Sequence, residues 1–167
     1  MLGTDSVLGL RFKIKNKMNI SDHTQPHKLE RLSFLWSEAR LVIAAFALFL
    51  GGVPPLLYIF ATPSLFFLLG SLLKISWLIS GIASGYLLYR WHKGGKTLFG
   101  EKSSKDAQVF FVSVVSGLNL GIAGLLGTNV GMSISFNRIV FIFVALIYLF
   151  SGWVLWKRWK ANGEKVF

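Results

Sequence analysis

Four long apolar stretches divide this chain and constrain what it can fold into. They cover residues 41–60, 64–89, 108–126 and 139–156. A helix needs about 20 apolar residues to cross the hydrocarbon core of a bilayer, and each stretch is close to that length. Backbone N–H and C=O groups in lipid must be paired within the protein, which requires helices or closed barrels. The sequence therefore predicts an all-α integral membrane bundle of four transmembrane helices.

The distribution of positive charge predicts the orientation of this bundle. Nearly all of the 18 Lys and Arg lie before the first stretch, between the second and third, or after the fourth. The exceptions are Lys74, inside the second stretch, and Arg138, at the start of the fourth. Cytoplasmic loops carry the excess of Lys and Arg. We therefore expect both termini in the cytoplasm, Arg40 at the inner start of the first span, and the connections near Thr62 and Thr128 outside.

The residues before the first span divide into two parts. Residues 1–27 are polar and basic and are expected to form a mobile cytoplasmic segment, with Met18 as an alternative initiation residue. Residues 28–167 are expected to form the four-helix transmembrane domain. Pro26 suits the first turn of a helix. The residues after it predict either an amphipathic helix on the membrane surface or a helical extension of the first span.

Tryptophans lie at the predicted cytoplasmic ends of the spans. Indole rings favour the headgroup layer of a membrane. The predicted interface anchors are Trp36, Trp91, Trp156 and Trp159.

Two segments of the chain resemble each other at a spacing of about 67 residues, which is long enough for a helical hairpin of two spans. Residues 84–91 read SGYLLYRW, and residues 151–159 read SGWVLWKRW with Lys157 as an insertion. Each copy continues with a glycine and an apolar pair, Gly95 with Leu98-Phe99 and Gly163 with Val166-Phe167. This similarity favours two helical hairpins related by an axis along the membrane normal. The alternative is that the two segments are alike only because the ends of membrane spans are generally rich in aromatic and basic residues.

Ionisable residues give no catalytic constellation. The seven acidic residues and three histidines all lie outside the four apolar stretches, and the chain has no cysteine. Cation-coupled transport generally uses an intramembrane carboxylate, so this distribution disfavours it. We predict no catalytic, cofactor-binding or metal site. The net charge of +11 is explained by the topology and by attraction to anionic lipids of the cytoplasmic leaflet, and we expect no nucleic-acid partner.

One candidate polar pocket is predicted in the outer half of the membrane. Lys74 is an ionisable residue inside a span, which is a functional hypothesis in itself. Pro54 and Pro55 break the first helix and free carbonyl groups at a similar depth, where Asn119 also lies. Together these four residues predict a pocket open to the outside that favours an anion or an uncharged polar ligand. The alternatives are that Lys74 reaches the surface, Pro54 ends the span, and Asn119 bonds another helix.

Small residues predict where helices approach closely. The pairs are Gly81 with Gly85 in the second span and Gly117 with Gly121 in the third. Glycines four residues apart allow close contact between helix backbones. The contact is either within one bundle or between copies.

Three functions are compatible with this pattern. The first is a non-catalytic subunit or interaction partner in a membrane assembly, with homo-oligomers or other membrane subunits as its partners. The alternative is an oligomeric small transporter or channel for an anion or polar solute. The lesser alternative is a membrane enzyme that acts on lipid-linked substrates.

Overall fold

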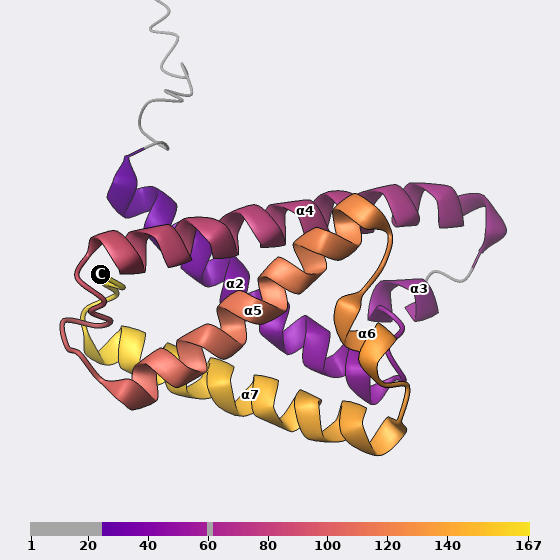
Figure 1. Cartoon of the computed structure of the whole chain (residues 1–167). Coiled ribbons are helices and arrows are strands. Elements are labelled where there is room, and N and C mark those ends of the chain that lie inside the picture. The colour runs from indigo at the N-terminus through magenta and orange to yellow at the C-terminus, as the bar shows by residue number, and fades with distance from the viewer. Residues whose placement is uncertain (1–24, 60–61) are drawn as a thin grey trace, which may run out of the picture.

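The computed structural model describes residues 25–59 and 62–167, and within these ranges the fold is all-helical without a strand. The four long helices are α2 (Pro26–Phe49), α4 (Pro63–Lys93), α5 (Ser104–Leu126) and α7 (Arg138–Ala161). Each contains a segment long and apolar enough to cross a membrane, which confirms the four candidate spans. Two short helices, α3 (Pro55–Ile59) and α6 (Val130–Ile134), lie at the end of the bundle opposite the C terminus (Figure 1).

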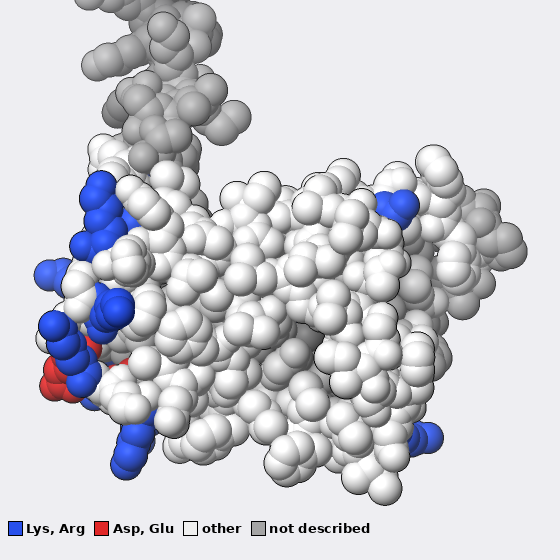
Figure 2. Space-filling view, in the orientation of Figure 1, with Lys and Arg blue, Asp and Glu red and all other residues white. Residues whose placement is uncertain are grey.

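The long helices pack so that α2 and α5 cross between α4 and α7 (Figure 1). The most extensive contacts join α4 to α5 and α2 to α7, and α2 also packs against α4 and α5. Lys and Arg gather at the end where the C terminus lies, and few appear at the opposite end (Figure 2). We call the first of these the basic end of the bundle.

The first span differs from its predicted limits. Instead of running over residues 41–60, helix α2 begins at Pro26 and continues without interruption to Phe49. Gly51 and Gly52 then adopt φ values of 83° and 89°, a conformation that only glycine enters at little cost. The two prolines follow, so the helix ends before them, as expected. The region before the span is a helical extension of it, the second of the two predicted alternatives.

Glycines allow α4 and α5 to touch at their backbones. A Cβ added to Gly81 would lie 2.7 Å from the Cα of Gly121, so neither position accepts a larger residue without movement. Gly117 faces Ser84 in the same seam, where an added Cβ would lie 1.9 Å from the serine Oγ. Gly85 differs from its predicted role, because a Cβ there would meet no described atom within 4 Å. Three of the four predicted packing glycines therefore form the α4–α5 contact.

A cluster of buried apolar residues closes the basic end. Trp159 is only 1% exposed and its ring lies 5.4 Å from that of Phe34. Its predicted role as an interface anchor therefore does not fit, because the ring is enclosed and cannot reach lipid headgroups. The other members of this closing cluster are Leu87, Leu98, Phe99, Phe110, Val114, Leu155 and Val166.

Trp36, Trp91 and Trp156 differ in how far they can serve as anchors. Trp156 is exposed on α7, Trp91 packs partly buried against the closing cluster, and Trp36 is hydrogen-bonded within the bundle.

Helices α4 and α7 end in the same backbone motif. The N–H of Lys96 donates to the carbonyl of Trp91 at 2.9 Å, and the N–H of Glu164 donates to that of Trp159 at 3.0 Å. In both cases the preceding glycine is left-handed, as in a Schellman motif. The two tails then meet, because the N–H of Phe99 donates to the carbonyl of Val166 at 2.8 Å. The two similar sequence segments thus form similar helix ends that pair with each other.

Candidate functional site

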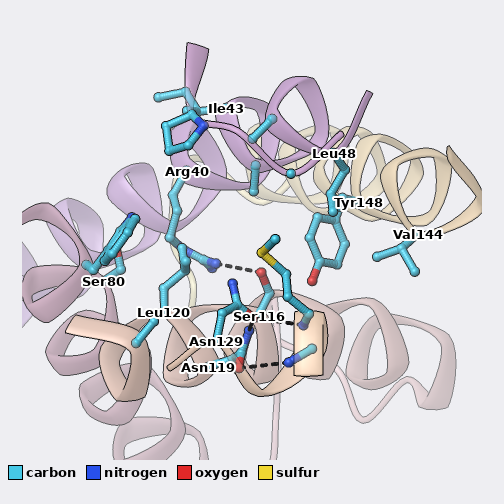
Figure 3. Close-up of a pocket in the computed structure, with 18 of the residues that line it drawn as sticks. Arg40, Ile43, Leu48, Ser80, Ser116, Asn119, Leu120, Asn129, Val144 and Tyr148 are labelled. Atoms are coloured by element: carbon cyan, nitrogen blue, oxygen red, sulfur yellow. Dashed lines mark hydrogen bonds between the residues drawn. The ribbon is translucent and has the colours of Figure 1, made fainter. Parts of the chain in front are cut away.

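A cavity of about 600 Å³ lies inside the bundle between α2, α5, α6 and α7, with a side of α4 in its wall. It appears as a hollow between α5 and α7 in Figure 2. Apolar side chains make most of the wall, among them Trp77, Met132 and Val144. Its polar side chains include Arg40, Ser80, Ser116, Asn119, Asn129 and Tyr148 (Figure 3). An apolar cavity with a few convergent polar groups is the usual form of a small-molecule site.

Arg40 supplies the positive charge of this cavity. Its side chain extends from α2 to the middle of α5, where Nη1 donates to Ser116 Oγ at 2.9 Å (Figure 3). Nη2 donates to the carbonyl oxygen of Ser113 at 2.7 Å. The residue is 6% exposed and lies inside helix α2, which is a candidate span from Pro26 to Phe49, instead of at the start of that span as predicted.

The surface of α5 explains how an arginine fits at this depth. Gly117 leaves a notch between Arg40 and Ser84, because a Cβ at Gly117 would lie 3.1 Å from the arginine Cζ. Ser113 and Ser116 border the same notch and supply acceptors. A charged group inside a membrane bundle is tolerated when protein groups replace its hydration.

Two asparagines join α5 to the connection that carries α6. Asn119 Nδ2 donates to Asn129 Oδ1 at 2.8 Å, and the N–H of Met132 donates to the same Asn129 oxygen at 3.3 Å. Asn119 Oδ1 accepts from the N–H of Gly131 at 3.4 Å. The amide of Asn119 thus ties the α6 connection, at the mouth of the cavity, to α5 in its wall. Asn119 therefore fulfils both predicted alternatives, because it lines a cavity and also bonds another segment.

A second polar group of the wall lies where α2 meets α4. Trp36 Nε1 donates to Ser80 Oγ at 3.0 Å, and Ser80 Oγ donates to the carbonyl of Ser76 at 2.7 Å. From the other side, the hydroxyl of Tyr148 points into the cavity (Figure 3). Hydrogen-bonding groups therefore face the cavity from α2, α4, α5 and α7.

Three of the four residues predicted to form a polar pocket line this cavity. They are Pro54, Pro55 and Asn119. Lys74 does not line it, because its side chain is exposed while its carbonyl faces Gly124 of α5. Arg40 takes the place of the expected lysine as the cationic group. The signal that could have located it is an arginine followed directly by apolar residues, in a helix that already starts at Pro26.

Glu38 is a second charged residue inside α2 that the sequence placed outside the spans. It is 6% exposed, and a Cβ added to Gly152 of α7 would lie 3.4 Å from its Oε2. Neither carboxylate oxygen has a hydrogen-bond partner among residues 25–59 and 62–167. The expectation that no carboxylate lies within a span is therefore wrong for Glu38, which is buried in the candidate span Pro26–Phe49.

The other described acidic residues form ion pairs at the basic end. Arg158 bonds Asp106 at 2.9 Å and Glu101 at 2.7 Å, and Arg90 pairs with Glu30. Glu164 lies 2.7 Å from Arg31 and also pairs with Lys160. A hydrogen bond from Lys160, with Lys160 and Arg31 as nearby positive charges, lowers the pKa of Glu164 below its usual value.

Within the described ranges no three His, Cys, Asp or Glu side chains come together as a metal site would require.

The chain matches no protein-family model, and no curated protein and no solved structure matches it.

Proposed function

We propose that this chain is a small multi-pass membrane protein that binds an anionic solute in the cavity at Arg40 and passes it across the membrane as part of an oligomer. The observation that carries this proposal is the buried guanidinium of Arg40 in the wall of a cavity of about 600 Å³. Arginine presents a planar fork of donors that suits carboxylate, sulfonate and phosphate groups. The apolar wall suits a ligand with an apolar body and one anionic group.

The shape of the bundle supports transport over storage of a ligand. The cavity reaches exposed residues of the α6 connection, among them Thr128, Gly131 and Ser133. On the other side of Arg40, the closing cluster around Phe34 and Trp159 fills the bundle. A site open toward one end and closed toward the other is what alternating access requires of one of its states. We place the closed basic end in the cytoplasm, since cytoplasmic loops carry the excess of Lys and Arg.

The solute is proposed as an anion or a polar molecule, and not a cation, because of the charge in the cavity wall. Arg40 reaches hydrogen-bonding groups of α5, and further hydroxyl and amide groups face the same space from Ser80, Asn119 and Tyr148. Hydroxyl and amide groups can donate to an anion that Arg40 attracts. The buried Glu38 does not line the cavity, so a cation would meet the positive charge of Arg40 in low dielectric and be repelled.

A second candidate is a non-catalytic subunit of a larger membrane assembly. The first half of α4 extends past the other long helices (Figure 1), and large apolar side chains are exposed along it, among them Phe66, Phe67, Leu68 and Leu72. Lipid covers such a surface, and so would another subunit or a second copy of this chain. Four helices seldom enclose a complete pathway, so both candidates predict association.

Flux in proteoliposomes tests the transport proposal and separates it from the second candidate. We expect vesicles with the wild-type chain to take up benzenesulfonate faster than empty vesicles, and to take up benzyltrimethylammonium no faster. Arg40→Gln should abolish this uptake, and Lys74→Gln, which removes an exposed charge that does not line the cavity, should keep it. Saturable binding without flux would contradict transport and would favour the second candidate, a subunit that binds a solute. Equal uptake by wild type and Arg40→Gln would contradict the assignment of the site.

A further inference from the structure

We propose that Glu38 is a proton-binding site coupled to the solute site, so that the chain binds one proton together with each anion; this rests on the anion site proposed above. The anion and the proton together add no net charge to the inside of the bundle. One O–H bond of a hydronium ion in the surrounding solution breaks and leaves a water molecule, and one O–H bond forms on a carboxylate oxygen of Glu38.

The positions of the two residues on α2 give each its own partner helix. Side chains two residues apart on a helix point to different faces. Arg40 accordingly points to Ser113 and Ser116 of α5, while Glu38 points to Gly152 of α7. Glu38 is thus close to the charge of Arg40 without being hydrogen-bonded to it. Its charge can respond to the cavity without occupying the N–H donors of Arg40 that Ser113 and Ser116 leave for a ligand.

Glu38 is set apart from the other acidic residues that the structure describes. Glu30, Glu101, Asp106 and Glu164 are each paired with an arginine at the basic end. Glu38 is buried with both oxygens unpartnered in the described part of the chain. A purely structural carboxylate at this depth would be paired or replaced by an apolar residue, because an unpaired buried charge is costly. A carboxylate that gains and loses a proton is stable in the neutral form and accounts for the missing partners.

The charges around Glu38 set the direction of the coupling. Arg40, two residues further along α2, is the charged residue closest to Glu38 on its own helix. Toward Glu38 and Arg40, α7 presents Gly152 and, one turn away, the phenol of Tyr148; α5 presents Ser113 and Ser116; and α4 presents Ser84. At the alkaline end of the pH range, where Glu38 has lost its proton, its charge balances that of Arg40 while the cavity is empty. When an anion binds Arg40, two negative charges face one positive charge in low dielectric, and Glu38 takes up a proton to restore the balance.

Binding of an anion that stays charged at every pH used isolates this effect. We would use benzenesulfonate with the full chain in nanodiscs of zwitterionic lipid, and measure binding by calorimetry from about pH 5 to about pH 9. Because binding takes up a proton, affinity should rise as pH falls, by about tenfold per pH unit at its steepest. Repeating the titration in two buffers of different ionisation enthalpy should give about one proton taken up per anion bound.

Glu38→Gln mimics the protonated carboxyl and should bind benzenesulfonate as tightly at high pH as the wild type does at low pH, with no proton uptake. Glu38→Asp keeps a carboxylate and should keep the proton uptake; it also decides the question if the glutamine variant does not fold. Glu164→Gln removes a surface carboxylate at the basic end and should leave both quantities unchanged.

The outcomes distinguish the coupling from the solute site. Binding to the wild type that is independent of pH and releases or takes up no proton would overturn the coupling and leave the anion site standing. Proton uptake that persists in Glu38→Gln would also overturn it. Absence of saturable binding to the wild type at every pH would overturn the anion site, and the coupling with it.

Discussion

The guanidinium of Arg40 donates a 2.7 Å hydrogen bond to the backbone carbonyl of Ser113, in the middle of α5. This carbonyl lies in a helix interior, yet it also accepts from a side chain of another helix. The contact is made where Ser113, Ser116 and Gly117 leave α5 narrow, so that a long cationic side chain can lie across it. Hydrogen bonds to charged groups contribute about 1.5–3 kcal/mol each, so this contact both positions the arginine and ties α2 to α5.

The glycine seam between α4 and α5 predicts a sharp difference between two alanine variants. Gly121→Ala places a methyl group against the backbone of Gly81, where an added Cβ lies 2.7 Å from the Cα, and should lower the free energy of unfolding by about 1–3 kcal/mol. Gly85→Ala meets no described atom within 4 Å and should be neutral or slightly stabilising. Thermal unfolding in detergent, followed by tryptophan fluorescence, gives the comparison. Equal midpoints for the two variants would argue against the observed seam.

The amide of Asn119 predicts how the mouth of the cavity is held. Asn119→Leu removes the 2.8 Å bond to Asn129 and the bond from Gly131, and should free the α6 connection. We expect faster hydrogen exchange over residues 127–136 and a loss of about 1–3 kcal/mol of stability, because Asn129 is left without this partner. Lys74→Leu, at an exposed position outside the cavity wall, should change neither quantity.

The closing cluster predicts a difference between two tryptophans of α7. Trp159→Ala removes a ring that is 1% exposed and packed on Phe34, and should destabilise the protein by about 3–5 kcal/mol. Trp153→Ala removes an exposed ring of the same helix and should cost much less. Chemical or thermal unfolding of the two purified variants measures this. If Trp153 proved the more important ring, the described packing of the basic end would be wrong.

The ion pairs of Glu164 predict a dependence of stability on acidity. Because the pKa of Glu164 is lowered in the folded protein, its contribution is present above the unfolded value of about 4.3 and is lost as the pH falls through the lower, folded value. Glu164→Gln should therefore lower the melting temperature slightly near neutral pH and have no effect in strong acid. High salt should reduce the difference, since both side chains of the Arg31–Glu164 pair are at least partly exposed to solvent.

Much of the fold could be predicted from the sequence because its signals are local. The length of the apolar stretches predicts four helices, and the run from Gly51 to Pro55 predicts the break after α2. The place of Asn119 and the prolines in one cavity followed from their similar depth along two spans.

Arg40, Glu38 and Trp159 could not be placed in this way, because their positions depend on distant segments. A basic residue beside an apolar stretch suggests a membrane boundary, and only the notch at Ser113, Ser116 and Gly117 of α5 shows where Arg40 lies. Glu38 precedes the apolar stretch of residues 41–60, so the sequence predicts that it lies outside the membrane. Trp159 is buried because the chain after α7 turns back and pairs with the segment after α4, a contact that composition does not encode.

Equilibrium binding of benzenesulfonate to the purified chain and to Arg40→Gln tests the central claim most directly, with Lys74→Gln as the matched loss of one positive charge. The cavity at Arg40 predicts saturable binding to the wild type and to Lys74→Gln, and a loss of at least about tenfold in affinity in Arg40→Gln, since a charge-assisted hydrogen bond is removed. Equal affinity in the wild type and in Arg40→Gln, or a loss confined to Lys74→Gln, would contradict it.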